Sequence, residues 1–340
     1  MNSESVSESN IKSLLQIALQ KHQSGELYEA ESLYKQILQI QPESIDEQEY
    51  KEYRAIVIGN LGNIFEQQGK FDTAVDYYQK TLLLTPEYGE AYYNLGNIFE
   101  KQGKLDAAIE AYQQALKIKP EIAQAHNKLG NVFQKQGHLR LAIESYQQAV
   151  KIKPIYAQAH YNLGDIFLKQ GKLEAAIESF QQALKIKPDY GIAHHQLGNT
   201  LHLGGKLEAS AKSYQQALKF LPESVATDTY FNLGNIYSGQ GKLELAVKTY
   251  EQALKINPDY SPAKFAILIN QLPIIYSSVA EINNQRNKYE QHLHKLAQSY
   301  KIANTKKLKE AVEFIGTLQT IFLAYQGLND LDLQQTYGEM

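Results

Sequence analysis

The chain contains no cysteine, no tryptophan and only three arginines, Arg54, Arg140 and Arg286. Without cysteine it can form neither disulfides nor thiolate metal sites. Phosphate and base recognition depend heavily on arginine, and the net charge of the chain is -3. The sequence therefore predicts that nucleic acid is not the partner.

Long apolar runs are also missing. The most apolar stretch, residues 265–276, is too short to cross a membrane and contains Asn270, Gln271 and Pro273. The first six residues, Met1-Asn-Ser-Glu-Ser-Val, are polar and acidic, unlike a signal peptide. We therefore predict no membrane association and a cytoplasmic location.

The chain does have a strict internal period. A Leu-Gly pair recurs at steps of 34, 34, 34, 34 and 36 residues, ending at Gly62, Gly96, Gly130, Gly164, Gly198 and Gly234. A second glycine follows each pair, and a proline closes each repeat, at Pro86, Pro120, Pro154, Pro188, Pro222 and Pro258. A period of this length indicates a solenoid, in which each repeat buries its apolar face against its neighbours.

Within one repeat the apolar residues follow two helical stripes. Residues Tyr92, Leu95, Gly96 and Phe99 fall at positions i, i+3, i+4 and i+7, and a second stripe runs through residues 105–116. Gly103 lies between the stripes, at a turn, and the closing proline ends the second helix. The pattern predicts two antiparallel helices that approach closely at small residues.

This pattern resembles the tetratricopeptide (TPR) repeat. Six repeats match it, and a weaker one precedes them with Gly25, Leu27, Ala30, Tyr34 and Pro42. The resemblance implies an all-α, right-handed superhelix of about seven repeats. The pentatricopeptide repeat, which reads RNA, lacks this Leu-Gly and proline pattern. We expect a disordered N-terminus over residues 1–10, a TPR array over 11–258, and a capping helix with a helical extension over 259–340.

The spacing from Pro42 to Pro86 is 44 residues, ten more than one repeat. Ser44 and Glu47 fit a capping box, which predicts a long helix from about Ile45 to Gln67. After the array, a capping helix is expected from Pro262 to Leu272. A second capping box at Ser278 predicts a helix to about Tyr300.

Two rows of polar residues follow the first helices, three positions apart, so they share a face. The first row precedes each leucine and comprises Asn60, Asn94, Lys128, Asn162, Gln196 and Asn232. The second row follows each glycine and comprises Asn63, Asn97, Asn131, Asp165, Asn199 and Asn235. We call the two rows together the ladder.

An amide side chain both donates and accepts hydrogen bonds, so the ladder could hold an extended peptide in a concave groove. Tyr93, Tyr161, His195 and Phe231 lie on the same helices and could add apolar contact. The alternative is that the amides only satisfy local backbone groups or water. As surface residues they should matter little for stability, and Asn131→Ala should cost under ~0.5 kcal/mol.

One subclass of TPR domains grips an acidic C-terminal peptide with a lysine one position before the first row. That position here holds no lysine; it reads Gly59, Tyr93, Asn127, Tyr161, His195 and Phe231. His126, His160 and His194 align with Tyr92, so we predict that they pack and do not bind metal. The sequence shows no catalytic motif, and we predict no cofactor, no metal and no catalytic residue.

Three segments of the tail, Gln271–Tyr276, Tyr289–Leu293 and Phe322–Asp330, resemble the repeat-to-catalytic junction of bacterial proteins similar to O-GlcNAc transferase and SPINDLY. The resemblance implies an alternative function as the substrate-recruiting arm of such a glycosyltransferase. Its catalytic domains would lie downstream of Met340, so no catalytic residue carries over and we predict no enzymatic activity for this chain. The leading prediction is a protein-interaction scaffold that binds a protein or an extended peptide.

Overall fold

The computed structural model describes residues 8–40, 46–270, 287–288, 290–295 and 298. The chain divides into two compact units, residues 1–166 and 167–340. No strand occurs among the described residues, and the predicted all-α TPR class is confirmed.

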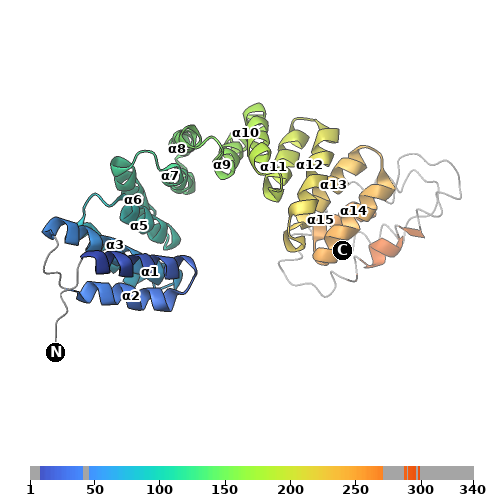
Figure 1. Ribbon diagram of the computed structural model, residues 1–340. Helices are drawn as coiled ribbons and strands as arrows, with labels where there is room; N and C mark the ends of the chain where they lie inside the picture. Colours follow the sequence, from blue (N-terminus) through green and yellow to red (C-terminus); the bar gives the residue numbers. More distant parts are fainter. Residues whose placement is uncertain (1–7, 41–45, 271–286, 289, 296–297, 299–340) are drawn as a thin grey trace. The chain divides into compact units, whose positions relative to one another are not determined.

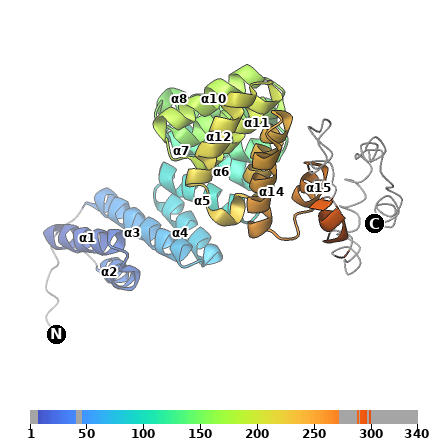
Figure 2. The same cartoon turned by 90° about the vertical axis from the view of Figure 1, so that its right-hand side faces the viewer.

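Unit 1 is built from helix pairs. Its helices are α1 (Glu8–Gln23), α2 (Leu27–Gln39), α3 (Glu47–Gln67), α4 (Phe71–Leu84), α5 (Gly89–Lys101), α6 (Leu105–Ile118), α7 (Ala123–Lys135) and α8 (Leu139–Ile152), and α9 (Ala157–Lys169) extends past its end. The two helices of each pair from α1 to α8 contact each other, and the second contacts the first helix of the next pair. Both views show α1, α2 and α3 packed together in this way (Figure 1, Figure 2).

Unit 2 repeats the arrangement. It contains α10 (Leu173–Ile186), α11 (Gly191–Leu203), α12 (Leu207–Phe220), a short 3-10 helix (Glu223–Val225), α13 (Thr227–Gly239), α14 (Leu243–Ile256) and α15 (Ser261–Asn270). Helix α15 packs on α14. Residues 287–288, 290–295 and 298 are helical and lie within the span predicted for the helix after Ser278, whose start lies outside the described residues.

The turn inside each pair requires glycine. Gly103 has φ of +72°, a left-handed conformation that a side chain disfavours. The N–H of Lys104 donates to the carbonyl of Phe99 (2.9 Å), and that of Gly103 donates to Glu100 (3.1 Å). These two bonds satisfy the last free carbonyls of α5 and turn the chain directly into α6.

The glycine of the Leu-Gly pair is required for a different reason. The rings of Tyr112 and Tyr146 are fully buried, each lying flat against the first helix of its repeat. A Cβ atom at Gly96 or at Gly130 would lie 2.6 Å from the Cε1 atom of that ring. The close contact predicted from the sequence is therefore mainly a contact between a helix backbone and a tyrosine ring.

Helix α3 is long, as the spacing predicts, but the predicted cap was wrong. The helix begins at Glu47, and its N-cap is Asp46, which accepts hydrogen bonds from the N–H groups of Gln48 (2.9 Å) and Glu49 (3.2 Å). Aspartate caps a helix as well as serine does and adds a charge that suits the helix dipole. Ser44 lies outside the described residues.

Helix α1 begins at Glu8, so residues 8–10 are helical, and residues 1–7 lie outside the described residues. None of the described helices has the length and apolar content needed to cross a bilayer.

Replacing Gly130 by leucine should lower the free energy of unfolding by more than ~2 kcal/mol, because the new side chain would overlap the Tyr146 ring. Gly239→Leu is the matched control, since nothing lies within 4 Å of a Cβ at Gly239 and its φ is not positive. Guanidinium denaturation followed by circular dichroism should give a lower midpoint for the first variant only. Equal midpoints would contradict the packing described here.

Candidate functional site

The second row of the ladder is tied to the buried tyrosines. In unit 1, the Oδ1 atoms of Asn63, Asn97 and Asn131 accept hydrogen bonds from tyrosine hydroxyls at 2.7, 2.8 and 2.7 Å, from Tyr78, Tyr112 and Tyr146. In unit 2, Asn199 and Asn235 accept from Tyr214 (2.7 Å) and Tyr250 (2.8 Å). Burial raises the pKa of Tyr214 and of Tyr250 to about 12, so these phenols keep their protons.

Sequence reasoning missed this pairing, although a signal was present. Each of these five asparagines stands 15 residues before its tyrosine. The repeat that carries Asp165 in place of asparagine has Phe180, which has no hydroxyl, at the tyrosine position. The Oδ2 atom of Asp165 instead accepts from Nε2 of Gln134 (2.9 Å).

The first row is bonded to the second row of the preceding repeat. The Nδ2 atoms of Asn94, Asn162 and Asn232 donate to the Oδ1 atoms of Asn63 (2.8 Å), Asn131 (3.0 Å) and Asn199 (3.2 Å). Asn60 instead donates to the carbonyl oxygen of Ile56, one turn back in α3 (2.9 Å). At these three junctions the ladder is therefore a set of internal hydrogen bonds that joins one repeat to the next.

Part of the amide capacity remains unused. Within the described part of the chain, the Nδ2 atoms of Asn63, Asn97 and Asn131 have no hydrogen-bond partner. The Oδ1 atoms of Asn60 and Asn94 have none either. Other positions are closed by neighbours: Asn162 accepts from Gln158 (2.9 Å), and Asn199 donates to Gln196 (2.7 Å).

Lys128 departs from asparagine in the first row because it serves an ion pair. Its Nζ atom lies 3.2 Å from Glu100, which also pairs with Lys135 at 2.7 Å, and the Glu100 side chain is only 10% exposed. Burial alone would raise the pKa of Glu100, but the hydrogen bonds and charges of the two lysines outweigh it and lower the pKa. Glu66 pairs in the same way with Lys101 (2.8 Å).

The aromatic residues beside the ladder pack against the buried tyrosines. The Tyr93 ring lies 5.9 Å from Tyr112, and the His195 and Phe231 rings each lie 5.7 Å from their tyrosines, Tyr214 and Tyr250. Tyr161 is half-buried on α9. These rings therefore cover the core as well as bordering the ladder.

The three aligned histidines make one recurring bond. The Nε2 atoms of His126, His160 and His194 each lie 2.9–3.0 Å from the carbonyl oxygen of a closing proline, at Pro120, Pro154 and Pro188. The histidine thus ties the start of a first helix to the turn before it. No cluster of three side chains able to hold a metal occurs among the described residues.

One cavity brings predicted site residues together. It has a volume of about 290 Å³ and is lined by Asn60, Asn63 and Asn94 of the ladder. Its other walls come from α1, α3, α4, α5 and the turn before α5, through Leu19, Ile56, Gly59, Tyr78, Tyr88, Glu90 and Ala91. The other predicted residues do not line it.

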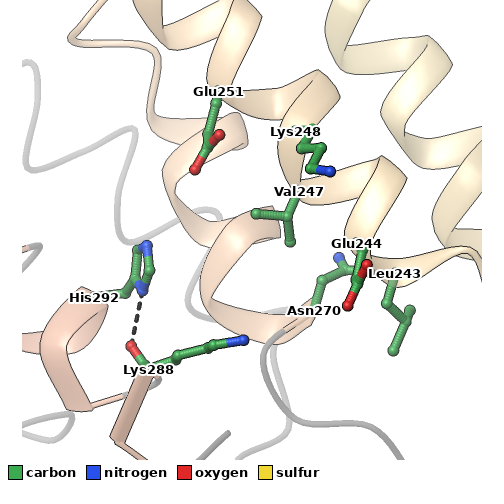
Figure 3. A pocket seen from close by; sticks show the side chains of 8 residues that line it. All are labelled: Leu243, Glu244, Val247, Lys248, Glu251, Asn270, Lys288 and His292. Carbon is green, nitrogen blue, oxygen red and sulfur yellow. Dashed lines mark hydrogen bonds between the residues drawn. The ribbon is translucent and has the colours of Figure 1, made fainter.

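A second cavity, of about 450 Å³, lies in unit 2 where the described residues near 290 face α14 and α15. Figure 3 shows Glu251, Lys248 and Val247 on α14, with Lys288 and His292 across the space. Nδ1 of His292 bonds the carbonyl of Lys288 (2.8 Å), one turn back. The charged side chains that line this cavity are of both signs and do not converge on one point, so they indicate no particular chemistry.

Family models define the class of protein. A model described as "TPR repeat" matches residues 62–103, 96–137 and 198–241, and two described as "Tetratricopeptide repeat" match residues 127–191 and 227–260. Together they span more than half of the 340 residues. The chain belongs to the tetratricopeptide repeat family.

Solved structures show the same fold. A tetratricopeptide repeat protein from Parabacteroides merdae ATCC 43184 matches with a TM-score of 0.51 and 16% identity, over 76% of this chain and 98% of that one. Pseudomonas aeruginosa pilF matches with a TM-score of 0.52 and 18% identity, over 68% and 97%. YrrB, described as a TPR protein with an unusual peptide-binding site, gives 0.49 and 23%, over 56% and 96%. No curated protein matches the chain.

The pairing of asparagine with tyrosine can be measured by a double-mutant cycle. Asn235→Ala should cost ~1–2 kcal/mol, because it leaves the buried Tyr250 hydroxyl without its acceptor. In a Tyr250→Phe background the same change should cost much less. Additive losses in urea denaturation would show that the bond contributes nothing.

Asn131 makes the same kind of bond, so Asn131→Ala should cost ~1 kcal/mol, more than the under ~0.5 kcal/mol expected from the sequence. The cost should not be larger, because Gln134 can still accept a hydrogen bond from the Tyr146 hydroxyl.

Proposed function

We propose that this chain is a protein-interaction scaffold whose ladder binds an extended peptide segment through the peptide backbone. The observation that supports this is that internal hydrogen bonds use only some of the amide donors and acceptors of the ladder. Asn63, Asn97 and Asn131 use their oxygens internally and keep their N–H groups, while Asn60 and Asn94 keep their oxygens. A peptide backbone needs a donor for each carbonyl and an acceptor for each N–H.

This arrangement favours binding with little dependence on the peptide sequence. The internal bonds hold each amide in one orientation before the peptide arrives, which reduces the entropy lost on binding. Each bond to a peptide should contribute ~0.5–1.5 kcal/mol net, so affinity should come from several repeats together. Nucleic acid fits poorly, because the ammonium groups of Lys101, Lys128 and Lys135 are already paired with carboxylates.

The sharpest test removes the donors while keeping the acceptors. In the triple variant Asn63→Asp, Asn97→Asp and Asn131→Asp, each Oδ1 can still accept from its tyrosine, but the unpaired N–H groups are gone. Affinity for a peptide selected from a random twelve-residue display library should fall ~10-fold or more, measured by calorimetry. The circular dichroism spectrum should stay unchanged.

The matched control adds the same charge elsewhere. Gln113, Gln114 and Gln147 are exposed on the second helices α6 and α8, and their replacement by glutamate should leave peptide affinity unchanged. If the triple aspartate variant binds the selected peptide as tightly as the parent, the ladder is only a structural network.

The second candidate, a substrate-recruiting arm of a glycosyltransferase, rests on the tail motifs. Residues 271–276 and 322–330 lie outside the described residues, so this candidate is supported by sequence resemblance alone. On either proposal the chain by itself does no chemistry. Incubation with UDP-GlcNAc or GDP-fucose and a serine-rich peptide should give no sugar transfer by mass spectrometry, and turnover above a heat-killed sample would contradict this.

A further inference from the structure

The position one residue before the first row of the ladder carries a ring in four repeats and none in the second repeat. The rings are Tyr93, Tyr161, His195 and Phe231, whereas repeat two has Gly59. Repeat four has Asn127, whose Oδ1 is bonded by Asn162 (3.0 Å). In repeat two no side chain replaces the missing ring.

Repeat seven shows what such a ring does. The Phe231 ring lies between two tyrosines, 5.7 Å from Tyr250 and 5.6 Å from Tyr260, edge-on to the latter. The residues at the same spacings in repeat two are Tyr78, 19 positions after Gly59, and Tyr88, 29 positions after it. Both flanking tyrosines are therefore present in repeat two, without the ring between them.

The space left by the missing ring is the 290 Å³ cavity. Gly59, Tyr78 and Tyr88 all line it. A Cβ built on Gly59 would meet Thr81 and Tyr88 at ordinary contact distances of 3.5–3.7 Å, so a side chain could start from this position without strain. Leu19, Ile56 and Ala91 supply apolar wall, and α1, which contributes Leu19, closes the side next to the first repeat.

Part of the cavity wall is polar and belongs to the ladder. Asn60, Asn63 and Asn94 line it, and they carry the unused Nδ2 of Asn63 and the unused Oδ1 atoms of the other two. Glu90 adds a carboxylate, and burial together with this charge raises the pKa of Tyr88 to about 12. A backbone held by these amides would pass directly over the apolar space.

We propose that this cavity is an anchor site for an aromatic side chain, phenylalanine or tyrosine, of the bound peptide. The partner's ring would occupy between Tyr78 and Tyr88 the place that Phe231 occupies in its own repeat. Aromatic rings prefer such offset and edge-on neighbours, which an aliphatic side chain cannot exploit. The Glu90 carboxylate disfavours acidic side chains. The inference rests on the proposed function and extends it: the ladder would contact the peptide backbone, and the cavity would add a preference for one kind of side chain.

The site can be tested without any peptide. N-acetyl-L-phenylalanine amide should shift the amide NMR signals of Gly59, Asn60 and Ala91 in the full chain, and N-acetyl-L-alanine amide should not. Gly59→Phe should weaken the probe ~10-fold or more by filling the space from within, with an unchanged circular dichroism spectrum. Gly239→Phe is the control, since it adds the same ring at a helical glycine that does not line the cavity, and it should leave the probe affinity unchanged. A Gly59→Phe variant that binds the probe like the parent would overturn the assignment, as would a parent that does not prefer the aromatic probe.

A gain-of-site variant gives an independent check. Phe231→Ala should open an equivalent space between Tyr250 and Tyr260, so that the same probe also shifts signals near Asn232. A folded variant without this second site would contradict the claim that the missing ring creates the cavity. The two proposals fail separately. The probe reports on the cavity alone, whereas the triple aspartate variant reports on backbone binding to the ladder.

Discussion

The buried tyrosine, which every repeat except the one with Phe180 carries, is the interaction on which the rest of the structure depends. Its ring lies so close to the first helix that only glycine fits opposite, as at Gly130 against Tyr146. The hydroxyl of the same tyrosine donates a hydrogen bond to the amide oxygen of Asn131, on the polar face. The ring of one tyrosine thus belongs to the core and its hydroxyl to the hydrogen bonds of the polar face, so a change in either affects the other.

This coupling explains why the polar face is so regular. A buried hydroxyl needs an acceptor, so folding alone requires an oxygen at each second-row position that faces a tyrosine. At Asn63, Asn97 and Asn131 the amide that supplies the oxygen also carries an N–H group without an internal partner. On the function proposed above, the capacity to bind a peptide backbone would be a by-product of core packing.

Much of the fold could be predicted from the sequence, because the period fixes it. The turn at Gly103, the closing prolines and the long helix ending at Gln67 all follow from local rules about φ, missing donors and spacing. The cap of that helix did not, since Ser44 and Asp46 are both good caps and only the structure shows which oxygen accepts. The choice between them depends on chain geometry that no local pattern encodes.

The candidate site was predicted less well, and for a definite physical reason. Helical periodicity assigns Tyr146 to the core and Asn131 to the polar face, so a pattern argument never brings the two together. The bond between them crosses from one face to the other along the length of a side chain. Gly59 was equally visible in the sequence, but its meaning depends on Tyr78 of α4 and on Tyr88 of the turn before α5.

The extra length of α3 has a consequence for how this array can change over time. Helix α3 has 21 residues, whereas α5 and α7 have 13 each, so it extends past their length by ~12 Å. Repeats three and four meet their neighbours through near-identical surfaces, and a copy of either could be inserted or lost without creating a new kind of junction. Repeat two cannot be exchanged in this way. Exchange of whole 34-residue repeats would therefore have to spare the junction of α3 with the preceding α2.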